Sequence, residues 1–393
     1  MPQPARLVST IAAPLAFSRA DDAPRLEWRA GTRLLVQRGD TELLVQNLDE
    51  TWAASETCRI PAPWPRRYGH CAVSPAGDLA VFAGLHALQV LDREGNVRWQ
   101  ARHRCWAGCA GHESFTEYAD ERDHRYVGSG SAGFSADGTL VWAHVRGPLT
   151  HDRGRGADEW RIMAAEDGTV LARAATHTAA EGSDHVGHPD PGQMGLTVGE
   201  GQDGAPLRWG RWNGRTLTVD SFGDENRVLL AVSPTGDRLL TVTHDQDTLA
   251  LHRVADGVVE AALSADALPP HPALTTGRPE TFEDDETQAF FDYEGGFVDE
   301  DTVVVGTVES DEEFGTGRHW LIDAARRGPV DRLVYPFEVP GPPRALGDGT
   351  WYTASATESA LHVWSTVPGP RGGARDQSRD RSGVAPVRAT IPG

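Results

Sequence analysis

Short segments in which apolar and polar residues alternate recur along the chain, and the members of each pair are separated by a polar turn containing glycine. The clearest pairs are HCAVSPAGDLAVFAG from His70, SAGFSADGTLVWAHV from Ser131 and LLAVSPTGDRLLTVT from Leu229. Alternation with a period of two indicates β-strands, and a short Gly-containing turn between two such runs indicates a β-hairpin. A second hairpin follows most of them, as in LQVLDREGNVRW and LALHRVADGVVEAAL. The repeating unit is therefore predicted to have four antiparallel strands.

Four-stranded units repeated along a chain predict an all-β fold, the β-propeller. The last unit has only three strands of its own, ending in LHVWSTV, so we expect the N-terminal segment ARLVSTIA to complete it and protect its edge. A single propeller would span residues 5–367, followed by a disordered Gly/Arg/Asp-rich tail over 368–393. We count seven blades, with six or eight as alternatives, near 26–57, 70–102, 131–176, 193–225, 229–264, 295–336 and 342–367.

Two short motifs make the chain similar to the WD40-like β-propeller family. Gly69-His70 followed by Ser74-Pro75 and Asp78 resembles the GH and SPDG signatures of that family, and LHVWS at 361–365 resembles its third strand. The chain has no Trp-Asp dipeptide, and its blades are irregular in length. The resemblance implies a propeller that serves as a binding platform, and it implies no reaction.

The segment TVGEGQDGAP contains a literal G-x-G-x-x-G at Gly199, Gly201 and Gly204. A dinucleotide-binding loop needs a helix immediately after these glycines, because the helix N-terminus holds the pyrophosphate. The aromatic strand LRWGRW follows instead. We therefore predict a turn between the first and second strands of the fourth blade, whose own fourth strand is the weakest in the chain.

Composition removes several classes of function. All 37 basic residues are arginine, so the chain offers no lysine for a Schiff base or a Walker-type phosphate loop. The net charge of -20 argues against a nucleic-acid or membrane partner. The N-terminal apolar run is interrupted by Pro14 and is a poor signal peptide. We expect a cytoplasmic monomer without a cofactor.

The long insertions predict which face of the propeller carries function. In a meander, the connections after the second and fourth strands of each blade share one face, and the insertions near 102–130, 147–158, 176–192, 264–294 and 309–317 all fall there. The first insertion contains an H-x-C-x3-C-x2-H arrangement, whose ligand types suit zinc but whose spacing matches no zinc motif. These metal candidates are His103, Cys105, Cys109 and His112, beside the partner-binding candidates Trp106, Glu113, Tyr118, His124 and Arg125.

Three other stretches supply further candidates for binding a ligand or partner. The segment at 184–190 could hold a metal, or form a polar turn fixed by Pro189 and Pro191. The third-blade stretch mixes arginine, aromatics and carboxylates, which suits a polar ligand or a surface salt-bridge patch. Aromatics after the acidic run at 283–286 suit a lid or docking segment. The candidates are Asp184, His185, His188 and Asp190; His144, Arg146, Asp158, Glu159 and Trp160; and Phe290, Phe291 and Tyr293.

Three functions fit these observations. We favour a non-enzymatic binding propeller that presents the loop-rich face to a protein or peptide partner, because no G-x-S-x-G, HExxH or phosphate-loop motif is present. The alternatives are a propeller enzyme, for example a metal-dependent hydrolase with its site at the channel mouth, and a structural propeller whose loops only pack.

Overall fold

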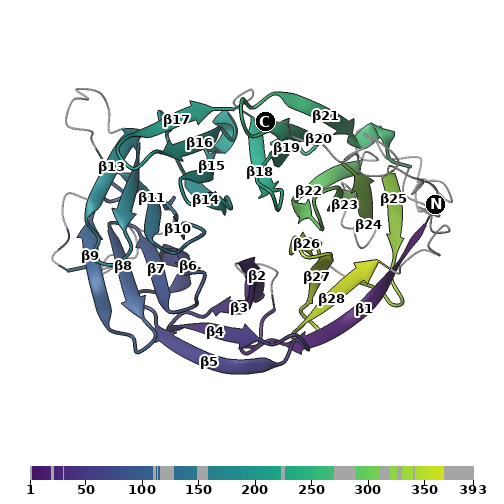
Figure 1. The fold of residues 1–393 in the computed structure, drawn as a ribbon, viewed down its shortest axis with the longest axis horizontal. Coiled ribbons are helices and arrows are strands. Elements are labelled where there is room, and N and C mark those ends of the chain that lie inside the picture. The colour runs from purple at the N-terminus through teal and green to yellow at the C-terminus, as the bar shows by residue number, and fades with distance from the viewer. Residues whose placement is uncertain are drawn as a thin grey trace, which may run out of the picture.

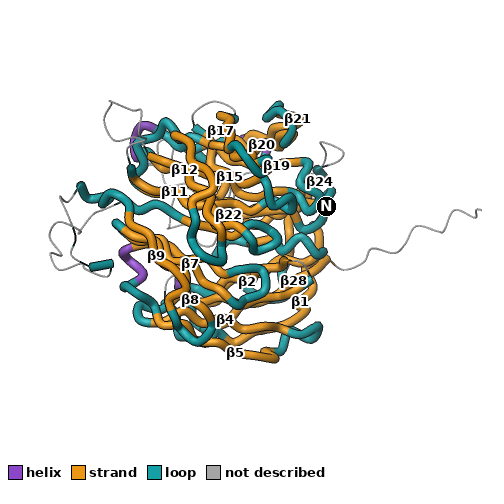
Figure 2. The backbone as a smooth tube through the Cα atoms, turned by 60° about the vertical axis from the view of Figure 1, so that its left-hand side comes forward, coloured by secondary structure: helices purple, strands orange, loops and turns teal. Residues whose placement is uncertain are grey.

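The computed structural model describes residues 2–18, 22–29, 31–108, 112, 114–115, 128–147, 158–222, 226–269, 289–309, 318–324, 330–339 and 341–366. Their strands form antiparallel meanders arranged in a ring (Figure 1). In the tube view the strands dominate the fold and short loops join them (Figure 2). Among the described residues, no helix has the length and apolar character needed to cross a membrane. The predicted tail over 368–393 lies outside them.

Five of the sheets have four strands each and follow the chain in order. They are β2 (Arg25–Arg29), β3 (Thr32–Arg38), β4 (Glu42–Leu48) and β5 (Ala54–Pro61); β6 (Gly69–Val73), β7 (Leu79–Gly84), β8 (Ala87–Asp92) and β9 (Val97–Arg102); β10 (Ala132–Phe134), β11 (Leu140–Arg146), β12 (Asp158–Ala164) and β13 (Val170–Ala175); β14 (Gly182–Gly187), β15 (Gln193–Gly199), β16 (Leu207–Trp212) and β17 (Leu217–Ser221); and β18 (Arg227–Val232), β19 (Arg238–Thr243), β20 (Thr248–Arg253) and β21 (Val259–Ser264). Short 3-10 turns lie in connections of the described part of the chain, among them η2 (Arg66–Tyr68), η3 (Gly201–Asp203) and η4 (Ala265–Ala267).

The sixth sheet has eight strands and closes the ring. Strand β1 pairs antiparallel with β28, from Ala5 opposite Thr366 to Ala12 opposite Ala360, and parallel with β25 at only two positions. The N-terminal strand therefore completes the last meander, as the sequence predicts, and Figure 1 shows it beside β28. The strands are β22 (Ala289–Phe297), β23 (Thr302–Glu309), β24 (Arg318–Asp323) and β25 (Val330–Val334), then β26 (Arg344–Ala345), β27 (Thr350–Ser355), β28 (Ala360–Thr366) and β1 (Gln3–Ala12).

A recurrent side-chain turn explains why the first two strands of a meander form a tight hairpin. In the second sheet, the backbone N–H groups of Asp78 and Leu79 donate to Ser74 Oγ, whose hydroxyl donates to Asp78 Oδ1. Gly77 takes a φ of 69°, a left-handed conformation that favours glycine. The Ser-x3-Asp-type pattern therefore fixes the turn locally, which is why the sequence identifies it.

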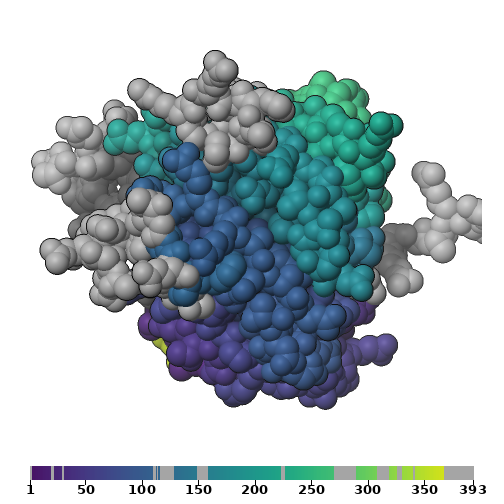
Figure 3. Space-filling model, turned by 90° about the vertical axis from the view of Figure 1, so that its left-hand side faces the viewer, coloured from purple at the N-terminus to yellow at the C-terminus, as the bar shows by residue number. Residues whose placement is uncertain are grey.

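The core lies between adjacent sheets and is built mainly from the second and third strands. Strand β8 is buried along most of its length, whereas the outer strand β9 alternates exposed residues with the buried Trp99. Between the third and fourth sheets, Trp142 and Trp160 pack edge to face at 5.3 Å. A Cβ on Gly210 would lie 2.5 Å from the Trp142 ring, so glycine there permits the sheets to approach. Figure 3 shows successive sheets packed side by side in chain order.

The fourth sheet corrects the predicted order of strands. Its first strand is β14, in the segment we expected to be an insertion, so Gly199–Gly204 connects β15 to β16 rather than the first strand to the second. Its fourth strand β17 is present and pairs with β16 over five residues. The pattern GSDHVG hides β14, because an innermost strand beside the channel need not alternate. The predicted turn followed by a strand is confirmed, with the 3-10 turn η3 within it.

Candidate functional site

Four predicted residues of the third and fourth sheets, together with two serines that the sequence analysis did not single out, meet in one buried group. His144 is at the end of β11, Asp158 and Trp160 begin β12, and Ser183 and His185 belong to β14. Together with Ser131 we call these side chains the junction cluster. It lies near the loop face, meaning the face with the connections that follow the second and fourth strands of each meander. All but the half-buried His185 are at most 5% exposed.

A chain of hydrogen bonds runs through the junction cluster. Trp160 Nε1 lies 2.9 Å from His185 Nε2, and His185 Nδ1 lies 2.8 Å from Ser131 Oγ. Ser131 Oγ is 2.8 Å from Ser183 Oγ, which is 3.0 Å from His144 Nδ1. The chain thus joins the innermost strand of the fourth sheet to the second strand of the third.

The indole at one end fixes the tautomer of His185. An indole N–H can only donate, so His185 Nε2 accepts and its Nδ1–H donates to Ser131. A hydroxyl can accept two hydrogen bonds, so the remaining directions depend on His144. Its Nε2 faces Asp158 Oδ2 at 3.9 Å, which favours a proton on Nε2; Ser183 then donates to His144 Nδ1 and Ser131 donates to Ser183. Burial lowers the pKa of His144 to about 3 and that of His185 well below 6.5, which keeps both rings neutral.

Asp158 is held by the connection between the two sheets. Its Oδ2 accepts from Ala180 N at 2.9 Å and from the Thr178 hydroxyl at 3.3 Å. Burial raises the pKa of Asp158 despite these bonds. Among the described residues, Asp158 Oδ1 and His144 Nε2 have no hydrogen-bond partner. Trp106 covers the cluster, with its ring 5.4 Å from His144 and the Arg146 guanidinium 5.6 Å from that ring.

Ser183, His144 and Asp158 follow the order of a nucleophilic triad, because His144 Nδ1 lies 3.0 Å from Ser183 Oγ and its Nε2 faces Asp158. The His144–Asp158 separation of 3.9 Å is longer than a hydrogen bond, so the carboxylate does not hold the imidazole as a working triad requires. The cluster is also closed, because His144, Asp158 and Trp160 are at most 1% exposed. Glu159, next along β12, binds Arg161 Nε at 2.9 Å and is equally buried.

Several other predicted site residues lie apart from the junction cluster. His188 is a buried turn residue, whose Nε2–H donates to Gly236 O and whose Nδ1 accepts from Asp190 N. Asp190 accepts from Gln193 and Gly192, and these hydrogen bonds lower its pKa. Both therefore fit the polar-turn interpretation. The aromatics Phe290, Phe291 and Tyr293 lie in β22 instead of a loop. Glu113, Tyr118, His124, Arg125 and Cys109 lie outside the described residues.

The proposed zinc ligands do not assemble within the described part of the chain. His112 stacks on His86 at 3.7 Å, Cys105 is buried in the core between the first two sheets, and His103 Nδ1 donates to Arg104 O. Burial lowers the pKa of His103 to about 3. No group of three or more His, Cys, Asp or Glu side chains that could hold a metal occurs among the described residues.

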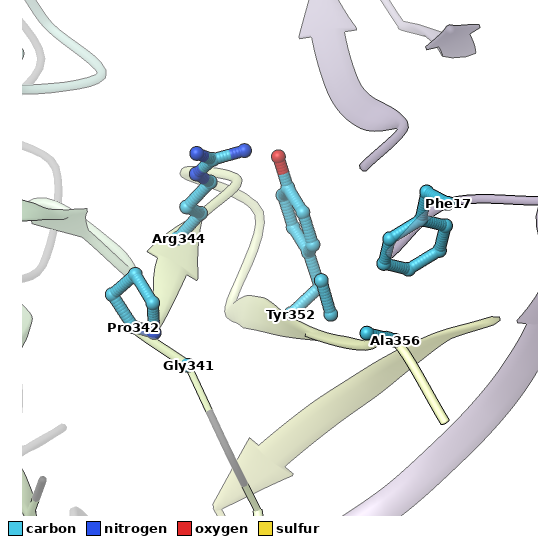
Figure 4. A pocket seen from close by; sticks show the side chains of 7 residues that line it. Phe17, Gly341, Pro342, Arg344, Tyr352 and Ala356 are labelled. Atoms are coloured by element: carbon cyan, nitrogen blue, oxygen red, sulfur yellow. The ribbon is translucent and has the colours of Figure 1, made fainter. Parts of the chain in front are cut away.

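A pocket that the sequence analysis missed opens on the loop face beside β26 and β27. It has a volume of about 160 Å3 and is lined mainly by apolar atoms. In Figure 4 the Tyr352 ring stands between the Phe17 ring and the Arg344 guanidinium. Arg344 Nε donates to Glu294 at 2.8 Å. Burial of Arg344 disfavours its positive charge, but the nearby Tyr352 and Glu294 outweigh that effect and raise the pKa of Arg344 above its usual value. Phe17 and Tyr352 are 335 positions apart, so no local pattern could pair them.

Comparison with known proteins supports the fold and no activity. No family model matches the chain, and no curated protein does. Among solved structures, one from a study of two prolyl endopeptidases matches at 12% identity and a TM-score of 0.50, and the match covers 93% of this chain and 51% of that chain. BamB from Moraxella catarrhalis matches at 13% identity and a TM-score of 0.48, over 92% of this chain and 99% of its own. The RRP9 WD40 repeats match at 11% identity and a TM-score of 0.47, over 91% of this chain and 100% of their own. The ring of antiparallel meanders is a β-propeller fold.

Proposed function

We propose that this chain is a seven-bladed binding propeller that takes an apolar side chain of a protein or peptide partner into the loop-face pocket. Seven blades follow if β22–β25 and β26–β28 with β1 count as two, since only two residue pairs join them. We also propose that the chain is a cytoplasmic monomer. The cytoplasmic location suits a chain in which Cys58 and Cys71 are thiols.

The observation that carries this proposal is the character of the pocket. Apolar recesses with an aromatic wall and a charged group at the base are typical anchoring points for a partner side chain. Phe17 and Tyr352 are 6% and 3% exposed, so their rings are already ordered and binding would cost little side-chain entropy. Ala356 is exposed at the rim, which leaves the entrance open.

The test compares two alanine-to-tryptophan variants on opposite faces. Ala356→Trp fills the pocket entrance, whereas Ala255→Trp places the same ring on an exposed turn between β20 and β21. Peptides would be selected from a random display library on the wild-type chain and their Kd measured on all three proteins. We expect A356W to weaken binding by about tenfold or more and A255W to change it by less than about twofold. Failure to enrich any peptide, or equal binding by A356W, would overturn the proposal.

The alternative function, a propeller enzyme with its site near the same loop face, has weaker support. A metal-dependent hydrolase needs several ligands around an open position. The junction cluster brings together one histidine and one carboxylate at 3.9 Å, and both are buried. We therefore rank the binding function above it.

A further inference from the structure

The wall of the central channel has a recess beside β10, which is shorter than the two innermost strands next to it. Strand β10 has three residues, whereas its neighbours β6 and β14 have five and six. Its central residue is Gly133, whose missing side chain leaves the space beside His185. A cavity of about 80 Å3 opens here, and its wall includes Arg25, Glu27, His70, Cys71 and Asp184. These residues come from β2, β6 and β14, so only ring closure brings them together.

The recess has one positive and one negative side. Arg25 is exposed on β2, and its Nη2 donates to Cys71 O at 3.3 Å. A guanidinium has five N–H donors, and this hydrogen bond uses one of them. On the other side, the Asp184 side chain is 76% exposed, and its Oδ1 lies 3.7 Å from His70 Nδ1, beyond hydrogen-bond length. Glu27, two positions from Arg25 on β2, also lines the recess, and its carboxylate favours the charged form of the Arg25 guanidinium.

The remaining wall is neutral. His185 uses both ring nitrogens within the junction cluster, as donor to Ser131 and acceptor from Trp160. Phe134 and Met194 are buried and apolar. The Arg25 guanidinium on one side disfavours a bare divalent cation, while the Asp184 carboxylate on the other disfavours a simple anion. The pattern suits a small molecule that carries both charges.

We propose that this recess binds a small zwitterion, namely an α-amino acid with a short side chain. Its carboxylate would pair with the Arg25 guanidinium, which matches carboxylates in a fork geometry. Its ammonium group would face the Asp184 carboxylate on β14. The volume of about 80 Å3 limits the side chain to a few atoms. This site shares no lining residue with the loop-face pocket and does not depend on the peptide-binding function.

Calorimetric titration of the full chain would test the proposal with defined probes. Glycine and L-alanine are expected to bind saturably, whereas acetate and methylamine, which each carry one of the two charges, are expected to bind at least about tenfold more weakly. L-leucine is expected to bind weakly because of its size. Methylamine binding as tightly as glycine would indicate a simple cation site and overturn the proposal. So would the absence of any saturable signal.

Single substitutions separate the recess from the rest of the surface. Arg25→Gln and Asp184→Asn are each expected to weaken glycine binding by about tenfold or more. Asp245→Asn is a matched control, because Asp245 is also 76% exposed and lies 3.9 Å from a histidine, His244. It is expected to leave glycine binding within about twofold, as is A356W. Equal binding by D184N and D245N would also overturn the proposal, and a thermal melt would confirm that each variant is folded.

Discussion

Two contacts between neighbouring sheets in this ring are built from different chemistry. The first and second sheets meet through aliphatic and aromatic side chains, including Leu34, Val45, Ile60 and Phe82. The third and fourth sheets meet through tryptophans and the hydrogen-bonded junction cluster. Both contacts are buried. An apolar contact tolerates imperfect matching, whereas a polar network is stabilising only when each donor meets an acceptor. The two contacts should therefore respond differently to mutation and to pH.

Phe82→Ala should cause the largest loss of stability. Phe82 is fully buried in the apolar contact and packs edge to face with Trp64 at 6.3 Å. Removing a buried phenyl ring costs about 3–5 kcal/mol through lost burial and the resulting cavity. Urea denaturation at pH 7.5 and 5.5 should give the same loss at both values. A loss that depends on pH would contradict the assignment of this contact as mainly apolar, with the permanently charged Arg38 guanidinium over the Phe82 ring.

Ser183→Ala should be the next most destabilising change. It removes the hydroxyl that accepts from Ser131 and donates to His144, so two buried polar groups lose a partner. Leaving a buried group unsatisfied costs about 1–3 kcal/mol. Ser55→Ala is the control, because the Ser55 hydroxyl is exposed and donates only to Asn47 O, and its loss should stay below about 0.5 kcal/mol. Equal unfolding free energies for the two variants would show that the cluster adds no stability.

Acidification should weaken the polar contact gradually. His144 has a folded pKa of about 3 and an unfolded pKa near 6.5. Its stabilising contribution is full above about pH 6.5 and is lost as pH falls towards the folded pKa, by about 1.4 kcal/mol per pH unit. The raised pKa of Asp158 acts in the opposite direction. His144→Gln should therefore reduce the slope of unfolding free energy against pH below 6.5, whereas Phe82→Ala should leave that slope unchanged. An unaltered slope in H144Q would contradict the neutral, buried state of His144.

Much of the fold was predictable because its signals are local. Hairpins such as the one at Ser74–Leu79 depend on a hydroxyl, a carboxylate and a glycine within six positions. The role of β1 was predictable for a different reason, because a three-stranded last unit leaves an edge that needs a partner. The order of strands in the fourth sheet was mispredicted because β14 has little apolar alternation.

The amino-acid sequence by itself determined the β-hairpin repeat, the pairing of the N-terminal strand β1 with the last meander and the residue types that could form a site. Only the tertiary structure decided which of those residues meet. His144 and Ser183 are 39 positions apart, and Phe17 and Tyr352 are 335 apart. Alternation along a strand specifies which side of a sheet a residue faces, but it carries no information about the neighbouring sheet. Ring closure supplies that information, because it brings the faces and inner strands of distant segments together around one axis.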